Sequence, residues 1–193
     1  MALAQFVREY RTVRRDEGWG SAEPAYYAAL PYRDLTGRYP AIWRIRARSY
    51  DTFVSRVLQP LEVGCLDILD LGAGNAWLSH RLVQRGHNVV AIDILDDPLD
   101  GLGAVRHYAH EHRLQPVLAE FDHLPLHSGT RDLAIFNASL HYSTDYTRTL
   151  TETLRVLRRS GTLVILDSPM YSDPTSGQRM VQEREARFLA TYG

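Results

Sequence analysis

The 193-residue sequence contains a single cysteine, Cys65, and no long apolar run. One cysteine excludes an intramolecular disulfide and argues against a zinc site built from cysteines. No stretch reaches the roughly 18–20 apolar residues of a membrane-spanning helix, and the first residues lack the apolar block of a secretory signal. We therefore expect a cytoplasmic protein that does not span a membrane.

Neither sign of charge is in excess. The 22 basic and 23 acidic residues leave a net charge of −1, which supplies no general attraction to nucleic acid or to an anionic membrane surface. A small basic cluster near the N-terminus is the exception, with Arg8, Arg11, Arg14 and Arg15. Acidic neighbours dilute its charge, so we interpret the cluster as a solvated helix face rather than as an RNA-binding arm.

The order of predicted elements indicates the fold class. Apolar residues at helical spacing predict helices at 1–17 and 40–58. Short apolar runs and helical patterns then alternate: predicted strands cover 65–72, 88–94, 115–121, 131–140 and 162–169, and predicted helices cover 75–86, 97–112, 144–159 and 175–192. This alternation favours parallel strands with helices on both faces, which is a doubly wound α/β fold.

A glycine loop follows the first of these strands. In open parallel sheets, ligands bind where the strands end, and Gly72 and Gly74 allow the backbone to turn sharply and to lie against a ligand. Trp77 stands where a dinucleotide-binding loop has its third glycine, and no phosphate-binding Gly-Lys-Ser/Thr follows. An NAD-dependent oxidoreductase is therefore the weakest of the functional interpretations.

Acidic residues end three successive strands. Asp70, beside the glycine loop, suits a ligand that carries an ammonium group. Asp93 can accept hydrogen bonds from both hydroxyls of a ribose, or it caps the next helix. Phe121 and Asp122 can stack on a purine and accept from its amine. Together these residues predict a ligand in which an amino acid is joined to an adenosine.

These motifs, in this order, resemble those of the class I S-adenosylmethionine-dependent methyltransferases over about residues 65–170. The matching segments are ILDLGAGNAWLSHRL, VVAIDI, AEFDHLPL, RDLAIFNASLHY and LRVLRRSGTLVILDSP. Ala76 replaces the family's usual third glycine, which we treat as a conservative change. The chain is most like the small-molecule branch that shares its domain with ubiquinone and sterol methylation enzymes.

The resemblance implies that S-adenosylmethionine is the cofactor and assigns residues to it. Asp70 and the glycine loop hold its methionine part, Asp93 its ribose and Asp122 its adenine amine. The full set of implied cofactor-binding residues is Asp70, Gly72, Ala73, Gly74, Asp93, Ile94, Phe121, Asp122 and Asn137. Asn137 lines the methyl-transfer site in this interpretation.

The resemblance also implies how the chain is divided. N-terminal helices commonly cover the cofactor in this family, so we expect residues 1–60 to form a helical lid on a methyltransferase domain at 61–193. One of Arg44, Arg46 and Arg48 is expected to pair with the cofactor carboxylate, and Arg46 is slightly preferred. A group of aromatic residues either lines an acceptor pocket or forms the core of the lid, namely Trp19, Tyr26, Tyr27, Tyr32 and Tyr39.

The family sheet usually ends with two further strands, which we expect this chain to lack. The open sheet edge would then favour a homodimer.

Methyl transfer needs mainly proximity and orientation, and it needs a base only when the nucleophile arrives protonated. His141 is the candidate base, with a structural or substrate-orienting histidine as the alternative. We expect the other histidines at the surface and no metal site.

The expected function is methyl transfer to a small-molecule acceptor. Asn137-Ala-Ser-Leu lacks the Asn/Asp-Pro-Pro-Tyr/Phe signature of amino-group methylation, so we favour an oxygen or carbon acceptor. The alternative is a non-catalytic protein that binds the cofactor as a sensor or partner subunit.

Overall fold

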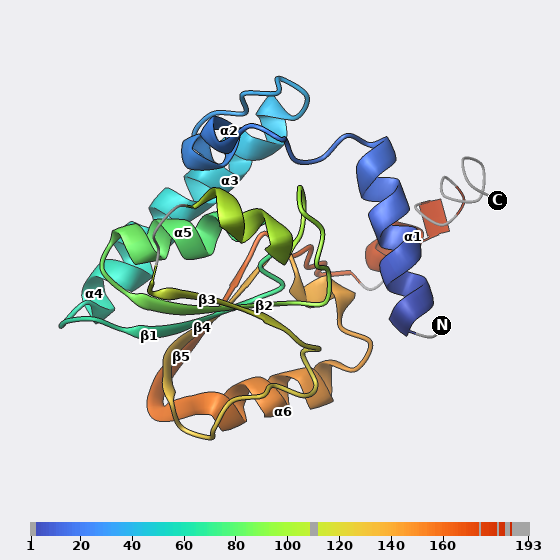
Figure 1. The fold of residues 1–193 in the computed structure, drawn as a ribbon. Helices are drawn as coiled ribbons and strands as arrows, with labels where there is room; N and C mark the ends of the chain where they lie inside the picture. Colours follow the sequence, from blue (N-terminus) through green and yellow to red (C-terminus); the bar gives the residue numbers. More distant parts are fainter. Residues whose placement is uncertain (1–2, 109–111, 174, 181, 184–185, 187–193) are drawn as a thin grey trace.

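The computed structural model describes residues 3–108, 112–173, 175–180, 182–183 and 186. Its centre is a parallel sheet in the order β3-β2-β1-β4-β5 (Figure 1). The strands are β1 (Asp67–Leu71), β2 (Asn88–Asp93), β3 (Leu114–Leu118), β4 (Arg131–Asn137) and β5 (Leu157–Leu166). The chain order reverses between β1 and β4, so a ligand site is expected at that switch point.

Helices cover both faces of the sheet, which confirms the doubly wound fold. Figure 1 shows α6 on one face and α2, α3 and α5 on the other. These helices are α2 (Pro24–Ala29), α3 (Pro40–Phe53), α5 (Trp77–Gln84) and α6 (Tyr146–Val156). Because successive residues of a strand face opposite sides, Ile68 packs in the α3 and α5 core and Leu69 packs in the α6 core.

The N-terminal elements divide between the core and the strand ends. α3 continues through a π-helical turn, η1 (Val54–Leu58), into α4 (Gln59–Leu61). Trp43 of α3 is 1% exposed and meets Trp77 of α5 edge to face, with ring centroids 5.9 Å apart. α1 (Leu3–Asp16) is separate from this layer and lies beside the carboxyl ends of the strands (Figure 1).

The predicted helix at 97–112 is wrong. The described part of this segment contains only a 3-10 helix, η2 (Leu102–His107), and 109–111 lie outside the described residues. The Asp97 carboxylate accepts from the backbone N–H of Leu99 at 2.9 Å and so stabilises a turn. A Cβ on Gly101 would lie 2.3 Å from the carbonyl oxygen of Leu95. This packing of loop on backbone replaces the regular helix.

The boundary between α6 and β5 also differs from the prediction. The helix ends at Val156 and the strand begins at Leu157, five residues before the predicted start at 162. Arg131 pairs with Leu157 across an irregularity in the β4–β5 ladder, and Arg158 then reaches Asp67 at 3.0 Å. In the predicted tail helix at 175–192, residues 175–180 are helical, and most of the remainder lies outside the described residues.

Among the described helices, none is long and apolar enough to cross a membrane.

Two histidines expected at the surface are buried. His87 is 2% exposed, accepts from the backbone N–H of Leu66 and faces Glu62 at 3.0 Å. His80 of α5 is 7% exposed and stacks on Tyr108, with ring centroids 4.3 Å apart. Burial, and then the charge of Arg81, lowers the pKa of His80 to about 4.

We predict that His80 makes the fold sensitive to acid. The unfolded chain binds a proton at His80 near pH 6.5 and the folded chain only near its lowered pKa of about 4, so stability falls as the pH falls through this interval. Replacement His80→Phe keeps an aromatic ring on Tyr108 and is expected to remove roughly 1–3 kcal/mol of that loss.

Urea denaturation of both proteins at about pH 7 and about pH 4.5 measures this difference. Other titrating groups are common to both proteins and cancel in the comparison. Identical losses of stability in wild type and variant would contradict the assignment.

Candidate active site

A cavity of about 510 Å³ opens at the carboxyl ends of the strands, next to the switch point. This volume is within the range of small-molecule sites. All ten predicted cofactor-binding residues line it: Arg46, Asp70, Gly72, Ala73, Gly74, Asp93, Ile94, Phe121, Asp122 and Asn137. The fold thus brings together residues that are far apart in the sequence. The most distant pair, Arg46 and Asn137, is separated by 91 positions.

Asp70 ends β1 as a buried carboxyl group, 1% exposed. Its Oδ2 accepts from the Ser79 hydroxyl at 2.7 Å, and its Oδ1 is buried without a hydrogen-bond partner among the described residues. Burial raises the pKa of Asp70 to about 7, against the opposing effect of Ser79. A cationic group in the cavity would satisfy Oδ1 and favour the ionised carboxylate.

The loop after β1 and the end of β2 are joined through Asp93. Its Oδ2 accepts from the backbone N–H of Gly74, and its Oδ1 accepts from that of Leu95, both at 2.8 Å. Burial raises the pKa of Asp93 in spite of these donors. The backbone N–H of Ile94 also donates to this carboxylate, which has about four acceptor positions and so can still accept from a ribose hydroxyl.

Gly72 lies where three loops converge. Its φ is +74°, and a Cβ there would lie 2.3 Å from Cβ of Ser139 and 3.3 Å from Cζ of Phe121. Ser139 in turn donates to the carbonyl of Leu71. The glycine is therefore required both by backbone conformation and by the packing of the β4 loop on the β1 loop.

Alanine at position 76 costs more conformational free energy than the sequence suggested. It is the N-cap of α5 with φ +58°, in the left-handed region, where an L side chain costs about 1–2 kcal/mol. The expectation of a conservative replacement is therefore wrong. Ala138 and Asp167, with φ of +55° and +51°, follow β4 and β5 at the same end of the sheet, so backbone strain gathers around the cavity.

Phe121 and Asp122, the residues predicted to contact adenine, line the cavity. Phe121 meets Phe136 edge to face, with ring centroids 5.4 Å apart. Oδ1 of Asp122 accepts from the hydroxyl of Thr149 at 2.6 Å. Thr149 belongs to α6 and lines the cavity, although no sequence motif singled it out.

The predicted helix at 1–17 forms as α1, and it contributes cavity-lining side chains that no sequence motif indicated. Phe6, Val7, Tyr10 and Arg14 of this helix line the cavity. The Arg14 side chain is 17% exposed, and its Nε bonds Oδ2 of Asp100 at 2.5 Å. The interpretation of the basic cluster as a solvated face is therefore wrong for Arg14, because a carboxylate 86 residues away holds it.

Two neighbouring arginines of the cluster also reach the loop after β2. Arg15 bonds the Asp97 carboxylate at 2.9 Å, and Arg11 stands 3.7 Å from it. The helical spacing of apolar residues predicted the position of α1. The local sequence could not show which acidic residues pair with its arginines.

Arg46 is the arginine of α3 that lines the cavity, whereas Arg44 and Arg48 are exposed. Its guanidinium lies over the Trp43 ring at 4.7 Å, and no hydrogen bond to it is found among the described residues. Burial, and then the charge of Arg14, lowers its pKa. An anion beside Arg46 would relieve both effects.

Other predicted residues lie elsewhere. His141 belongs to a 3-10 turn, η3 (Leu140–Tyr142), and is not among the cavity-lining residues, whereas Tyr142 beside it is. None of the five aromatic residues proposed for an acceptor pocket lines the cavity. Tyr26 and Tyr27 are buried, and Trp19 stacks on Tyr39 at 4.0 Å, so most of this group forms a packed core.

In the described ranges no group of three His, Cys, Asp or Glu side chains is placed to hold a metal ion.

The geometry predicts unequal effects for the two loop glycines. Gly72→Ala adds left-handed strain and a collision with Ser139, with an expected loss of about 2–5 kcal/mol. Gly74→Ala adds strain of about 1–2 kcal/mol only, because its Cβ meets nothing nearer than the Asp100 carbonyl at 3.9 Å. Urea denaturation distinguishes them, and equal losses would contradict the packing at Gly72.

Comparison with known families agrees with this geometry. Residues 69–165 match the family model described as a methyltransferase domain, which is just over half of the chain. The chain belongs to this methyltransferase family.

Curated relatives match over the same region. An uncharacterised methyltransferase of Mycobacterium tuberculosis strain H37Rv is 35% identical over 96 residues, which are 50% of this chain and 37% of that protein. A malonyl-[acyl-carrier protein] O-methyltransferase of Hahella chejuensis is 30% identical over 104 residues, 52% of this chain and 36% of that protein. The chain thus matches little more than a third of the length of these relatives.

Solved structures support the fold. The PH0226 protein of Pyrococcus horikoshii OT3 superposes with a TM-score of 0.55 at 24% identity, covering 73% of this chain and 64% of that one. At this identity the likeness establishes the fold alone.

Proposed function

We propose that the protein transfers a methyl group from S-adenosylmethionine to a small-molecule acceptor. The observation that carries this proposal is the arrangement of three carboxyl groups along one cavity, Asp70, Asp93 and Asp122. The three polar parts of the ligand predicted from the sequence each have a complementary group in this cavity. The unpartnered Oδ1 of Asp70 fits the ammonium, Asp93 fits the ribose diol and Asp122 fits the adenine amine.

Two arginines complete the cofactor part of the proposal. The guanidinium of Arg46 fits the carboxylate of the methionine part, since it lines the cavity near Arg14 and Asp100. Arg14 is already paired with Asp100, so Arg46 is the better partner for a ligand anion. The bound cofactor supplies an electrophilic methyl group, and the residues of this chain bind and orient the two reactants.

We propose that the acceptor binds in the cavity next to α1, which is the part of the predicted lid at 1–60 whose helix lies at the strand ends. Phe6 and Tyr10 stack at 5.8 Å, and Tyr142 approaches the edge of Tyr10 at 5.6 Å. This aromatic wall suits a small acceptor with an apolar body. The sequence favoured an oxygen or a carbon acceptor. The Hahella relative is named an O-methyltransferase, which supports the oxygen acceptor.

His141 is a weaker candidate base than its position in the sequence suggested. It lies outside the cavity lining, with its ring 4.3 Å from that of Tyr142. The alternative of a structural histidine, which supports Tyr142 in the wall, fits this position better.

The open edge of β5 keeps a homodimer as a proposal. β5 pairs with β4 on one side, and no partner strand lies on its other side in the described sheet.

The proposed function predicts binding of S-adenosylmethionine and S-adenosylhomocysteine in isothermal calorimetry, with no binding of NAD. Asp93→Ala removes the diol acceptor and the link to Gly74, and is expected to weaken binding at least about tenfold. Asp96→Ala changes an exposed carboxylate three residues away and serves as the matched control.

Absence of binding by the wild-type chain would contradict the proposal. Tight binding without transfer to any acceptor of a broad panel would favour the non-catalytic alternative.

A further inference from the structure

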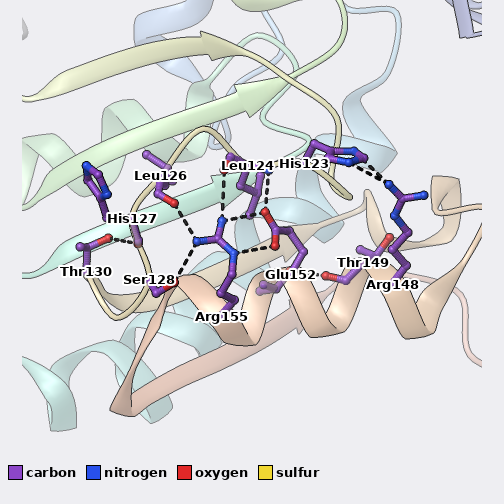
Figure 2. A network of polar contacts seen from close by, with 11 residues as sticks. His123, Leu124, Leu126, His127, Ser128, Thr130, Arg148, Thr149, Glu152 and Arg155 are labelled. Carbon is purple, nitrogen blue, oxygen red and sulfur yellow. Dashed lines mark hydrogen bonds and ion pairs between the residues drawn. The ribbon is translucent and has the colours of Figure 1, made fainter.

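Three polar residues of α6 point toward the loop between β3 and β4. Thr149, Glu152 and Arg155 are spaced three residues apart, which places them along one side of the helix. Figure 2 shows the side chains of Glu152 and Arg155 extending to the loop at Leu124 and Leu126, and Thr149 reaches Asp122 of the same loop. We call these three residues the α6 stripe.

Two residues of the α6 stripe, Glu152 and Arg155, hold the backbone of the loop. Glu152 accepts from the N–H of Leu124 at 2.9 Å, and its carboxylate is bonded twice by Arg155 at 2.7 Å. Arg155 also donates to the carbonyls of Leu124 and Leu126 and to the hydroxyl of Ser128, at 2.9–3.2 Å (Figure 2). One guanidinium therefore fixes the path of the loop through three of its residues.

Thr149 continues this contact to Asp122 itself. The Thr149 hydroxyl donates its only proton to Oδ1 of Asp122, at 2.6 Å. The contact of 2.8 Å between the hydroxyls of Ser143 and Thr149 must then have Ser143 as the donor. Hydrogen bonds in such a chain strengthen one another and fix the rotation of the carboxylate.

The other oxygen of Asp122 is less constrained. Oδ2 has an ion pair with Nε of Arg148 at 3.8 Å, and that arginine side chain is 53% exposed. Among the described residues no hydrogen bond to Oδ2 is found. Oδ2 is thus the oxygen of Asp122 that no hydrogen-bond donor of the described residues occupies.

We propose that the α6 stripe positions the Asp122 carboxylate for the amine of adenine, and that Thr149 is the residue that makes the site selective for adenine. This inference rests on the proposed function, because Asp122 is assigned to adenine there. With Oδ1 held by Thr149, the Asp122 carboxylate presents a fixed acceptor to an amino group and repels a carbonyl in the same place. Thr149 acts through Asp122 and is a positioning residue.

The test compares the affinities of S-adenosylhomocysteine and S-inosylhomocysteine, which differ by an amine or an oxygen on the purine. The wild-type chain is expected to prefer the adenosine compound at least about tenfold. Thr149→Val keeps the shape and removes the donor, and is expected to reduce this preference to about twofold or less. Thr149→Ser restores the hydroxyl and should restore the preference.

Thr151→Val is the matched control, since it makes the same change at an exposed position of α6. If Thr149→Val does not fold, Arg155→Lys takes its place, because lysine keeps the charge and loses the fork that spans Glu152 and the loop. A reduced preference in that variant is likewise expected.

The outcomes separate the two proposals. Failure of the wild-type chain to bind S-adenosylhomocysteine overturns the proposed function. An unchanged preference in a folded Thr149→Val chain, or in Arg155→Lys where that variant replaces it, overturns the role of the α6 stripe alone. An equal loss of affinity for both compounds also overturns it, since that result shows a purely structural contribution.

Discussion

The requirement that shapes this site is the burial of a carboxyl group at the end of the central strand. Asp70 has one oxygen bonded to Ser79 and one without a partner among the described residues. Such a group is costly to ionise in the free protein. Under the proposed function, the ammonium group of the ligand would remove this penalty, so the buried carboxyl group would favour such a ligand. The glycine loop next to it is joined to Asp93 through the backbone N–H of Gly74.

The elements around Asp70 depend on contacts between distant segments. α1 contacts the loop after β2 through Arg14 and Asp100, and this partly buried ion pair lies in the wall of the cavity. α6 holds the loop after β3 through Arg155. The floor of the site is thus formed by the sheet, whereas α1 and the loop after β3 are held by polar contacts, which are directional and fix positions.

The sequence predicted the sheet, and it predicted which strand-end residues line the cavity, because both depend on local patterns. Strand ends such as Asp70 and Asp93 can be placed from apolar runs, and the topology brings them together. The burial of Arg14 depends on a carboxylate far along the chain, and no local pattern contains that information. The same limit applies to Thr149, whose partner lies in another loop.

Local propensity failed where loop packing prevailed. The segment at 97–112 has a helical pattern, but Asp97 caps a turn and Gly101 packs on backbone. Ala76 adopts a glycine-like conformation because the loop and α5 determine it. Both departures lie beside the cavity, and departures from local sequence rules are expected at functional sites.

The most direct test of the role of Asp70 is the number of protons released when S-adenosylhomocysteine binds. With its pKa at about 7, Asp70 is about half protonated at neutral pH, and a bound ammonium would ionise it. Calorimetry in two buffers of different ionisation enthalpy should therefore show release of about half a proton, which disappears in Asp70→Asn. Equal binding enthalpies in the two buffers, or unchanged proton release in the variant, would contradict the account.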